Sequence, residues 1–372
     1  MREYLLVLCV AAAVTYLLTP VARRIAVRTG AMAEPRDRDV HAIPTPRLGG
    51  VAMYAGVAAA FLVAHQLPAL QTVFTYSDVQ AVLVGGGIIV ALGIVDDRWP
   101  LDALTKLAGQ LVAAGVMVLL GLQLLTLTLP GVGALSLGVE GVPLTVILTL
   151  LTVNAINFID GLDGLAAGVG AIAALAFFAF AYSLSSGQVT SGLAQSRISS
   201  PALIAVVLAG VCLGFLPHNF NPARIFMGDS GSMLIGLMLA GSVTSLTGQF
   251  DYDALPPEVA FPALLVLLLP AAVLAVPFVD LLLAVIRRTR AGRSPFAPDK
   301  AHLHHRLLEI GHSHTRAVLI MYFWTALLAF GGVAVAVTGG ILPVLAVMGG
   351  LAALALVASS IPRLRAARAL DR

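Results

Sequence analysis

The stretch VPLTVILTLLTVNAINFIDGLDG, residues 142–164, joins a long apolar run to a cluster of polar residues. Its last eleven residues, NAINFIDGLDG, contain two Asn, two Asp and two Gly. A carboxylate in or beside hydrocarbon is energetically costly, so Asp160 and Asp163 need a polar environment. We therefore expect a membrane-spanning helix over 142–158 that ends at an aqueous surface.

The composition of the whole chain agrees with a membrane protein. The chain has 372 residues and a mean hydropathy of +0.96, and 11% of its residues are charged, whereas soluble proteins have about 25%. We predict a single domain, residues 1–372, that is an all-α polytopic integral membrane protein with about eleven transmembrane helices. The expected spans are 4–22, 49–66, 79–95, 103–121, 142–158, 162–183, 201–217, 231–248, 260–286, 316–338 and 340–358.

The basic residues indicate the orientation. With the N-terminus outside and the C-terminus cytoplasmic, 20 of the 22 Lys and Arg residues lie on the cytoplasmic side, and only Arg2 and Arg197 lie opposite. An even number of spans would place the basic tail and the basic loops on opposite sides, so the pattern favours an odd number. The cytoplasmic loops are then 23–48, 96–102, 157–163, 217–230 and 287–315.

Each cytoplasmic loop carries an unusual polar cluster. The clusters are HAIPTPRLGG (41–50), DDRWPLD (96–102), NFIDGLDG (157–164), HNFNPARIFMGDSGS (218–232) and PDKAHLHHRLLEIGHSH (298–314). Outer loops such as TGQFDYDALPPE show no comparable constellation. We therefore expect one composite active site, formed by the cytoplasmic loops at the membrane surface.

The first acidic motif is the pair Asp96 and Asp97. Adjacent carboxylates repel each other, so we expect a cation such as Mg²⁺, or the basic Lys106, to neutralise them. The structural alternative is that the pair caps the short loop before the fourth helix.

A second acidic motif places Asp229 just before an expected helix start. Gly228 and Gly231 allow close backbone approach, and free N–H groups at a helix N-terminus attract phosphate. An acid at such a site is best explained by a bridging Mg²⁺, which prefers oxygen ligands and keeps substrate phosphates in its shell. An ordinary Asp-Ser helix cap is the alternative.

Two basic motifs complete the set. His302, His304 and His305 lie within four residues; zinc binding, phosphate binding or proton donation, and a solvated basic loop are all open for them. Arg47 lies where the second span enters the membrane, and it is either a snorkelling anchor or a phosphate ligand. The two glycines that follow favour helix packing.

Acids for a metal, basic groups for phosphate and glycines for close approach occur together at one interface. This combination suits phosphoryl transfer between a lipid-borne and a soluble reactant, which depends on positioning and charge neutralisation. Other classes fit less well. A transporter would place charges at mid-membrane, where Asp280 is the only candidate, and the His-Glu-x-x-His pattern of a metallohydrolase is absent.

At these residues the chain resembles the polyprenyl-phosphate N-acetylhexosamine-1-phosphate transferases. NAINFIDGLDGLAAG and FMGDSGS carry the resemblance, which spans about residues 41–315. It implies transfer of a sugar-1-phosphate from a UDP-sugar to undecaprenyl or decaprenyl phosphate with release of UMP. Such a reaction is the first membrane step of cell-envelope polysaccharide synthesis, at the cytoplasmic face of a bacterial plasma membrane. The cofactor implied is Mg²⁺, with Mn²⁺ as the alternative.

The resemblance also implies residue roles. Catalytic positions are Asp96, Asp97, Asp229, His302, His304 and His305, and the metal ligands are Asp229 and Asn157. Nucleotide-binding positions are Asn157, Asp160, Asp163, Asn219, Phe226 and Gly228, with Phe226 suited to stack on uracil. Lys106 and Arg47 match phosphate-binding positions.

Two motifs indicate the branch of the family. HAIPTPRLGG and HLHH are similar to the WecA/TagO branch, because the muramyl-peptide branch has Thr-Pro-Thr-Met-Gly-Gly and three consecutive His. We therefore expect UDP-GlcNAc as donor, with phospho-MurNAc-pentapeptide transfer as the alternative. The expected partners are the donor, the lipid phosphate and the membrane, with no nucleic acid; relatives suggest a homodimer.

Two mechanistic expectations follow. A lipid phosphate is mostly dianionic near neutral pH, since its second pKa is about 6, so it can attack the donor directly. The rival mechanism is a covalent phospho-Asp at Asp96 or Asp97. If the NAINFIDGLDG stretch begins the sixth helix, Asp160 and Asp163 share one face.

Overall fold

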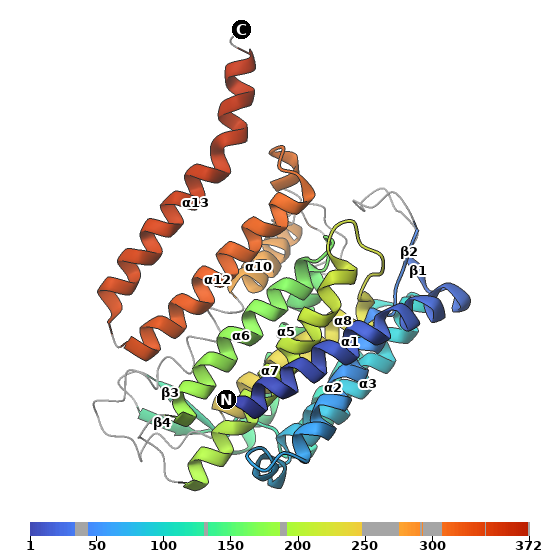
Figure 1. Cartoon of the computed structure of the whole chain (residues 1–372), viewed down its shortest axis with the longest axis vertical. Coiled ribbons are helices and arrows are strands. Elements are labelled where there is room, and N and C mark those ends of the chain that lie inside the picture. The colour runs from blue at the N-terminus through green and yellow to red at the C-terminus, as the bar shows by residue number, and fades with distance from the viewer. Residues whose placement is uncertain are drawn as a thin grey trace.

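The computed structural model of the chain describes residues 1–33, 44–129, 133–186, 192–247, 275–290, 292, 307–338 and 340–370. Helices dominate these residues, and most of them run roughly alongside one another in a bundle (Figure 1). The helices are α1 (Arg2–Thr29), α2 (Gly49–His65), α3 (Asp78–Arg98), α4 (Ala103–Leu119), α5 (Gly141–Ile159), α6 (Leu165–Ser186), α7 (Gly192–Asn219), α8 (Gly228–Thr247), α10 (Ala275–Arg290), α12 (His314–Thr338) and α13 (Ile341–Leu370).

Short elements join the helices. Strands β1 (Met32–Ala33) and β2 (Thr45–Pro46) pair antiparallel before α2, and β3 (Thr126–Leu129) pairs antiparallel with β4 (Gly133–Ser136) before α5. Two 3₁₀ helices, η1 (Gln71–Thr75) and η2 (Gly138–Glu140), precede α3 and α5. The two hairpins lie at opposite ends of the bundle (Figure 1).

The all-α membrane fold is confirmed at the level of the described helices. Seven of them contain a segment long and apolar enough to cross a membrane, and three further apolar helices are shorter: α2, α4 and Ile341–Leu356 of α13. Each matches an expected span. Of the ninth expected span, 260–274 lies outside the described residues, and 275–286 falls in α10. The total of eleven spans and their orientation stay predictions.

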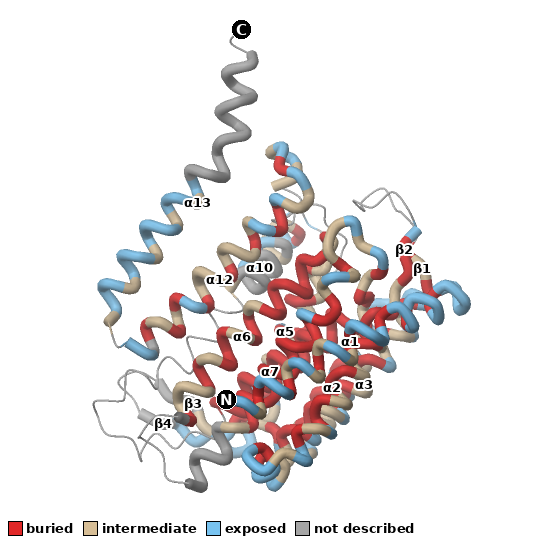
Figure 2. Tube along the Cα trace, in the orientation of Figure 1, coloured by how far each residue is buried: buried red, intermediate tan, exposed pale blue. Residues whose placement is uncertain are grey.

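Helix α8 lies at the centre of the bundle. Every residue from Ser230 to Thr247 is buried, and α8 packs against α3, α5, α7 and α2 (Figure 2). Its sequence makes this packing possible, because Gly, Ala and Ser occupy many of its positions and let neighbouring helices approach closely. The polar cluster at its N-terminus is therefore held by protein on several sides.

Two glycines bring α2 and α3 close to the start of α8. A Cβ on Gly50 would lie 2.3 Å from the backbone N of Gly231, and a Cβ on Gly93 would lie 2.3 Å from the backbone N of Ser230. No real side chain tolerates such distances, so only glycine fits at these two positions. The expectation that the glycines after Arg47 serve helix packing is confirmed.

Candidate active site

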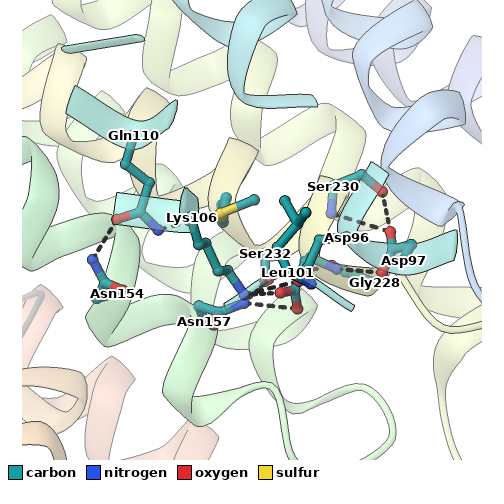
Figure 3. Close-up of polar contacts among 12 residues, drawn as sticks. Asp96, Asp97, Leu101, Lys106, Gln110, Asn154, Asn157, Gly228, Ser230 and Ser232 are labelled. Carbon is teal, nitrogen blue, oxygen red and sulfur yellow. Dashed lines mark hydrogen bonds and ion pairs between the residues drawn. The ribbon is translucent and has the colours of Figure 1, made fainter. Parts of the chain in front are cut away.

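The site is built around the N-terminus of α8, where the motif FMGDSGS begins the helix. Gly228 is in the left-handed region at φ +70°, and Asp229 belongs to the first turn rather than preceding the helix as expected. Asp97, from the last turn of α3, accepts hydrogen bonds from Asp229 N at 2.9 Å, Ser230 N at 3.3 Å and Ser230 Oγ at 2.8 Å (Figure 3). Asp97 thus caps α8 from another helix.

This cap corrects one prediction. The N–H groups of Asp229 and Ser230 are not free for phosphate, because the Asp97 carboxylate already occupies them. The space above Gly228 is also filled, since a Cβ there would lie 2.3 Å from Asp97 Oδ2. The glycine permits close approach as predicted, but the approaching group belongs to the protein itself.

A charged cluster forms beside this cap. The Lys106 ammonium, from α4, contacts Asp229 Oδ2 and donates to Asp96 Oδ2 at 3.1 Å. Asn157 of α5 donates to Asp229 Oδ1 at 3.0 Å and to Ser232 Oγ at 2.8 Å (Figure 3). Four residues that the sequence singled out therefore meet at one point, from α3, α4, α5 and α8.

The Asp96–Asp97 pair does not share one neutralising group. Asp96 faces Lys106 and also accepts from Leu101 N at 2.7 Å, whereas Asp97 faces the N-terminus of α8. The side chain that caps the next helix is Asp102, which accepts from Leu104 N and Thr105 N. The capping alternative is confirmed for Asp96 alone, because its Oδ1 accepts from Leu101 N in the loop before α4.

The NAINFIDGLDG stretch divides differently from the prediction. Helix α5 ends at Ile159, residues 160–164 form a turn, and α6 begins only at Leu165. Asp160 and Asp163 consequently do not share a helix face. Burial raises the pKa of the Asp160 carboxyl to about 7; the negative charges of Asp97 and Asp163 add to the shift and the positive charge of Arg47 opposes it.

The 160–164 turn is tied to the loop between α7 and α8. Asp163 Oδ2 accepts from Asn221 Nδ2 at 2.9 Å and from Ala223 N at 3.0 Å. Asn219, the last residue of α7, is buried; its Oδ1 accepts from Gly164 N at 3.1 Å and its Nδ2 donates to Ile225 O at 3.1 Å in the loop that follows α7. Through these hydrogen bonds, the two predicted nucleotide-binding residues fix the 160–164 turn against the segment between α7 and α8.

The loop before α2 also joins the site. Phe226 N donates to Pro46 O at 2.8 Å, and Gly49 N donates to Phe226 O at 3.1 Å, so residues 46–49 run beside the segment that leads into α8. Arg47 lies in this segment and its charge acts on both Asp97 and Asp160. The structure therefore brings Arg47 and Phe226 to the same end of the bundle as Asp229.

Three predicted residues, His302, His304 and His305, lie outside the described residues, and their place in the site stays a prediction. Several polar residues of the site were not predicted. Ser230 and Ser232 could have been found from the motif FMGDSGS itself. Gln110 could not, and Asn154 was noted only as part of the stretch NAINFIDGLDG. Asn154 Nδ2 donates to Gln110 Oε1 at 2.8 Å between α5 and α4, and no local pattern predicts this pairing (Figure 3).

The donor atoms of the cluster suit a hard divalent cation. Asp96 and Asp229 contribute carboxylates on either side of a positive group, and Asn157 adds an amide. Within the described ranges no group of three or more His, Cys, Asp or Glu side chains is arranged to hold a metal. Mg²⁺ commonly binds one or two carboxylates and takes its other ligands from water and substrate phosphates, so this oxygen-rich set fits it.

Comparison with known proteins gives a family match and several similar proteins. Residues 79–247 match the family described as Glycosyl transferase family 4, and this segment holds Asp96, Lys106, Asn157 and Asp229. The chain is 52% identical over 335 residues to a decaprenyl-phosphate N-acetylglucosaminephosphotransferase of Mycolicibacterium smegmatis, covering 89% of this chain and 82% of that protein.

Two further relatives extend the comparison. The protein of the same name from Mycobacterium tuberculosis is 52% identical over 369 residues, covering 98% of this chain and 90% of its own length. A probable undecaprenyl-phosphate N-acetylglucosaminyl 1-phosphate transferase of Bacillus subtilis is 36% identical over 307 residues, which are 82% of this chain and 77% of that protein. From its site and these relatives, the chain belongs to glycosyl transferase family 4.

Proposed function

We propose that the protein transfers GlcNAc-1-phosphate from UDP-GlcNAc to a polyprenyl phosphate and releases UMP. The observation that carries this proposal is the cluster at the start of α8, where Asp229 is held between Lys106 and Asn157 beside Asp96. The names of relatives that share half of their residues with the chain support GlcNAc as the sugar and a polyprenyl phosphate as the acceptor.

The proposed reaction is a single displacement. An oxygen of the lipid phosphate attacks the β-phosphorus of the donor and forms a new P–O bond, while the bond from that phosphorus to the bridging oxygen breaks and UMP leaves. Asp97 has both carboxylate oxygens engaged by α8, and Asp96 is engaged by Lys106 and Leu101. This engagement favours direct attack over a covalent phospho-Asp.

The chain's own residues supply positioning and charge. Asn157 orients the Asp229 carboxylate, and Asp97 fixes the start of α8, which carries Asp229. The positive charge of Lys106 stabilises the negative charge that develops on the phosphates during the reaction. A Mg²⁺ ion held by Asp229 and Asn157 would, when bound, neutralise the pyrophosphate oxygens. Arg47, with the histidines His302, His304 and His305, is assigned to the remaining phosphate charge.

Asn219 and Asp163 are assigned an indirect part in nucleotide binding, because their side chains tie the 160–164 turn to the α7–α8 loop. The uracil is assigned to Phe226 and the rest of the donor to the turn that holds Asp160. We place this site at the cytoplasmic face of a bacterial plasma membrane, on the distribution of Lys and Arg. A homodimer is part of the proposal on the family resemblance alone.

A donor panel with the purified full-length protein tests the proposal. We expect UMP release from UDP-GlcNAc only when polyprenyl phosphate and Mg²⁺ are both present. UDP-GalNAc and UDP-MurNAc-pentapeptide should give at least about tenfold less, because discrimination of a polar group by a buried site commonly exceeds that ratio. UMP release that needs no lipid, accompanied by a phosphorylated protein, would overturn single displacement, and preference for the muramyl-peptide donor would overturn the assigned sugar.

Lys106 provides a separate test of the cation site. Its ammonium is paired with both Asp96 and Asp229, so a divalent cation that binds these carboxylates has to displace a positive charge. We expect Lys106→Gln to bind Mn²⁺ at least about threefold more tightly, as measured by electron paramagnetic resonance, while its turnover falls.

Arg98→Gln is the matched control for Lys106→Gln. It removes a positive charge from the end of α3 that also carries Asp96. There the Arg98 guanidinium carbon lies 5.2 Å from the centroid of the Trp99 ring. Its Mn²⁺ affinity should stay close to that of the unaltered protein. Unchanged or weaker Mn²⁺ binding by Lys106→Gln would show that the cation does not bind at Asp229.

A further inference from the structure

A tyrosine of α12 reaches the turn that carries two of the predicted donor-binding acids. Helix α12 packs along α6, and the Tyr322 hydroxyl donates a hydrogen bond to Gly164 O at the end of the 160–164 turn. Tyr322 lies outside the segment that matches the family, and no motif in the sequence singled it out. The role of the Tyr322–Gly164 hydrogen bond is therefore inferred from the geometry around the turn.

The Gly164 peptide groups are held from two directions. Gly164 N donates to Asn219 Oδ1 at 3.1 Å, so the end of α7 holds one side of the residue. Gly164 O accepts from Gly168 N at 3.0 Å within α6 and also from the Tyr322 hydroxyl. Three separate segments thus converge on one residue of the turn.

The local backbone is built to receive this tyrosine. Gly164 has φ +80°, a conformation that costs a residue with a Cβ about 1 kcal/mol or more. A Cβ on Gly168 would lie 2.0 Å from Tyr322 Cζ, so the tyrosine ring rests directly on the α6 backbone. The backbone conformation of the turn therefore requires glycine at 164, and the contact between α6 and α12 requires glycine at 168.

We propose that Tyr322 is a positioning residue that sets the 160–164 turn, and through it the placement of Asp160 and Asp163 against the donor. The assignment of the turn to the donor rests on the proposed function. The hydroxyl of Tyr322 acts on a backbone carbonyl and not on the reacting atoms. Loss of that hydroxyl should therefore weaken donor binding more than it slows the chemical step.

The test compares Tyr322→Phe with Tyr54→Phe in the purified full-length protein. Tyr54 is a matched control, because its hydroxyl also donates to a backbone carbonyl of a neighbouring helix, Leu83 O at 2.9 Å, between α2 and α3. We expect Tyr322→Phe to raise the KM for the UDP-sugar about three- to tenfold with kcat within about twofold, the range expected for one lost hydrogen bond. Tyr54→Phe should leave KM within about twofold.

A second variant removes dependence on a single substitution. Gly168→Ala adds a methyl group where the Tyr322 ring lies, so it should displace the ring and reproduce the increase in KM. If Tyr322→Phe and Tyr54→Phe change thermal stability equally and neither changes KM, Tyr322 has only a structural role and the proposal is overturned.

Hydrogen exchange separates this proposal from the proposed function. In Tyr322→Phe the amides of residues 161–164 should exchange faster than in the unaltered protein or in Tyr54→Phe, whether or not the protein uses a UDP-sugar. Faster exchange without any transfer activity would support the positioning role of Tyr322 and overturn the proposed reaction. Unchanged exchange at these amides would overturn the positioning role of Tyr322.

Discussion

Asp229→Asn is expected to lower turnover by at least about 10²–10³-fold, the cost of removing one group that stabilises charge in a transition state. The substitution keeps the size of the side chain but removes the charge that pairs with Lys106 and that a divalent cation would use. It leaves the backbone N–H that Asp97 accepts, so α8 should still begin in the same place. Steady-state UMP release and Mn²⁺ binding should both fall, while thermal stability in detergent changes little.

Asp102→Asn is the control for that experiment. Asp102 is exposed at the start of α4 and accepts from two backbone N–H groups, and Asn serves about as well as Asp at such a position. Its activity should stay within about twofold of the unaltered protein. If Asp229→Asn kept near-normal turnover at limiting Mg²⁺, Asp229 could not be the cation ligand.

Gly93→Ala should cause the second large loss, and it should affect stability and activity together. A Cβ on Gly93 would lie 2.3 Å from both the Cα and the N of Ser230 and 2.7 Å from the carbonyl carbon of Asp229. These are backbone atoms, so α3 and α8 have to separate. Overpacking of this kind costs about 1–3 kcal/mol or more. Because the separation moves Asp229 itself, we expect a lower unfolding temperature together with at least about tenfold lower turnover.

Gly115→Ala provides the comparison. Gly115 lies in α4, and a Cβ there would meet no atom within 4 Å. Alanine is favoured over glycine within a helix by about 1 kcal/mol, so this variant should be as stable as the unaltered protein or slightly more so. If Gly93→Ala changed stability and turnover no more than Gly115→Ala does, the close approach of α3 to α8 would not be required.

Hydropathy and motif chemistry predicted the helices and the members of the central cluster. The apolar runs placed all the described spans near their observed positions, because a long apolar helix is determined by local composition. The motifs, together with the family resemblance, grouped Asp96, Lys106, Asn157 and Asp229, and the structure brings these four residues together. The family named from the motifs is confirmed.

Contacts between side chains that lie far apart in the sequence could not be predicted from it. Nothing local indicates that Asp97 caps α8 from α3, since a cap is usually supplied by the residue that precedes a helix. The turn at 160–164 was misjudged because Asp160 and Asp163 fit a helix by spacing, whereas bonds to Asn221 and Asn219 hold the turn in place. Tyr322 was missed because one hydroxyl on an apolar helix has no periodic signature.

The enclosed position of α8 has a consequence for biogenesis. Among the seven helices long enough to span a membrane, α8 is the least apolar, and its Ser, Thr and Gly residues make it a weak candidate for independent insertion. The helices that enclose it, α2, α3, α5 and α7, all precede it in the chain. During synthesis, α8 therefore emerges after the helices that enclose it, and Asp229 enters the membrane region when α8 packs against them.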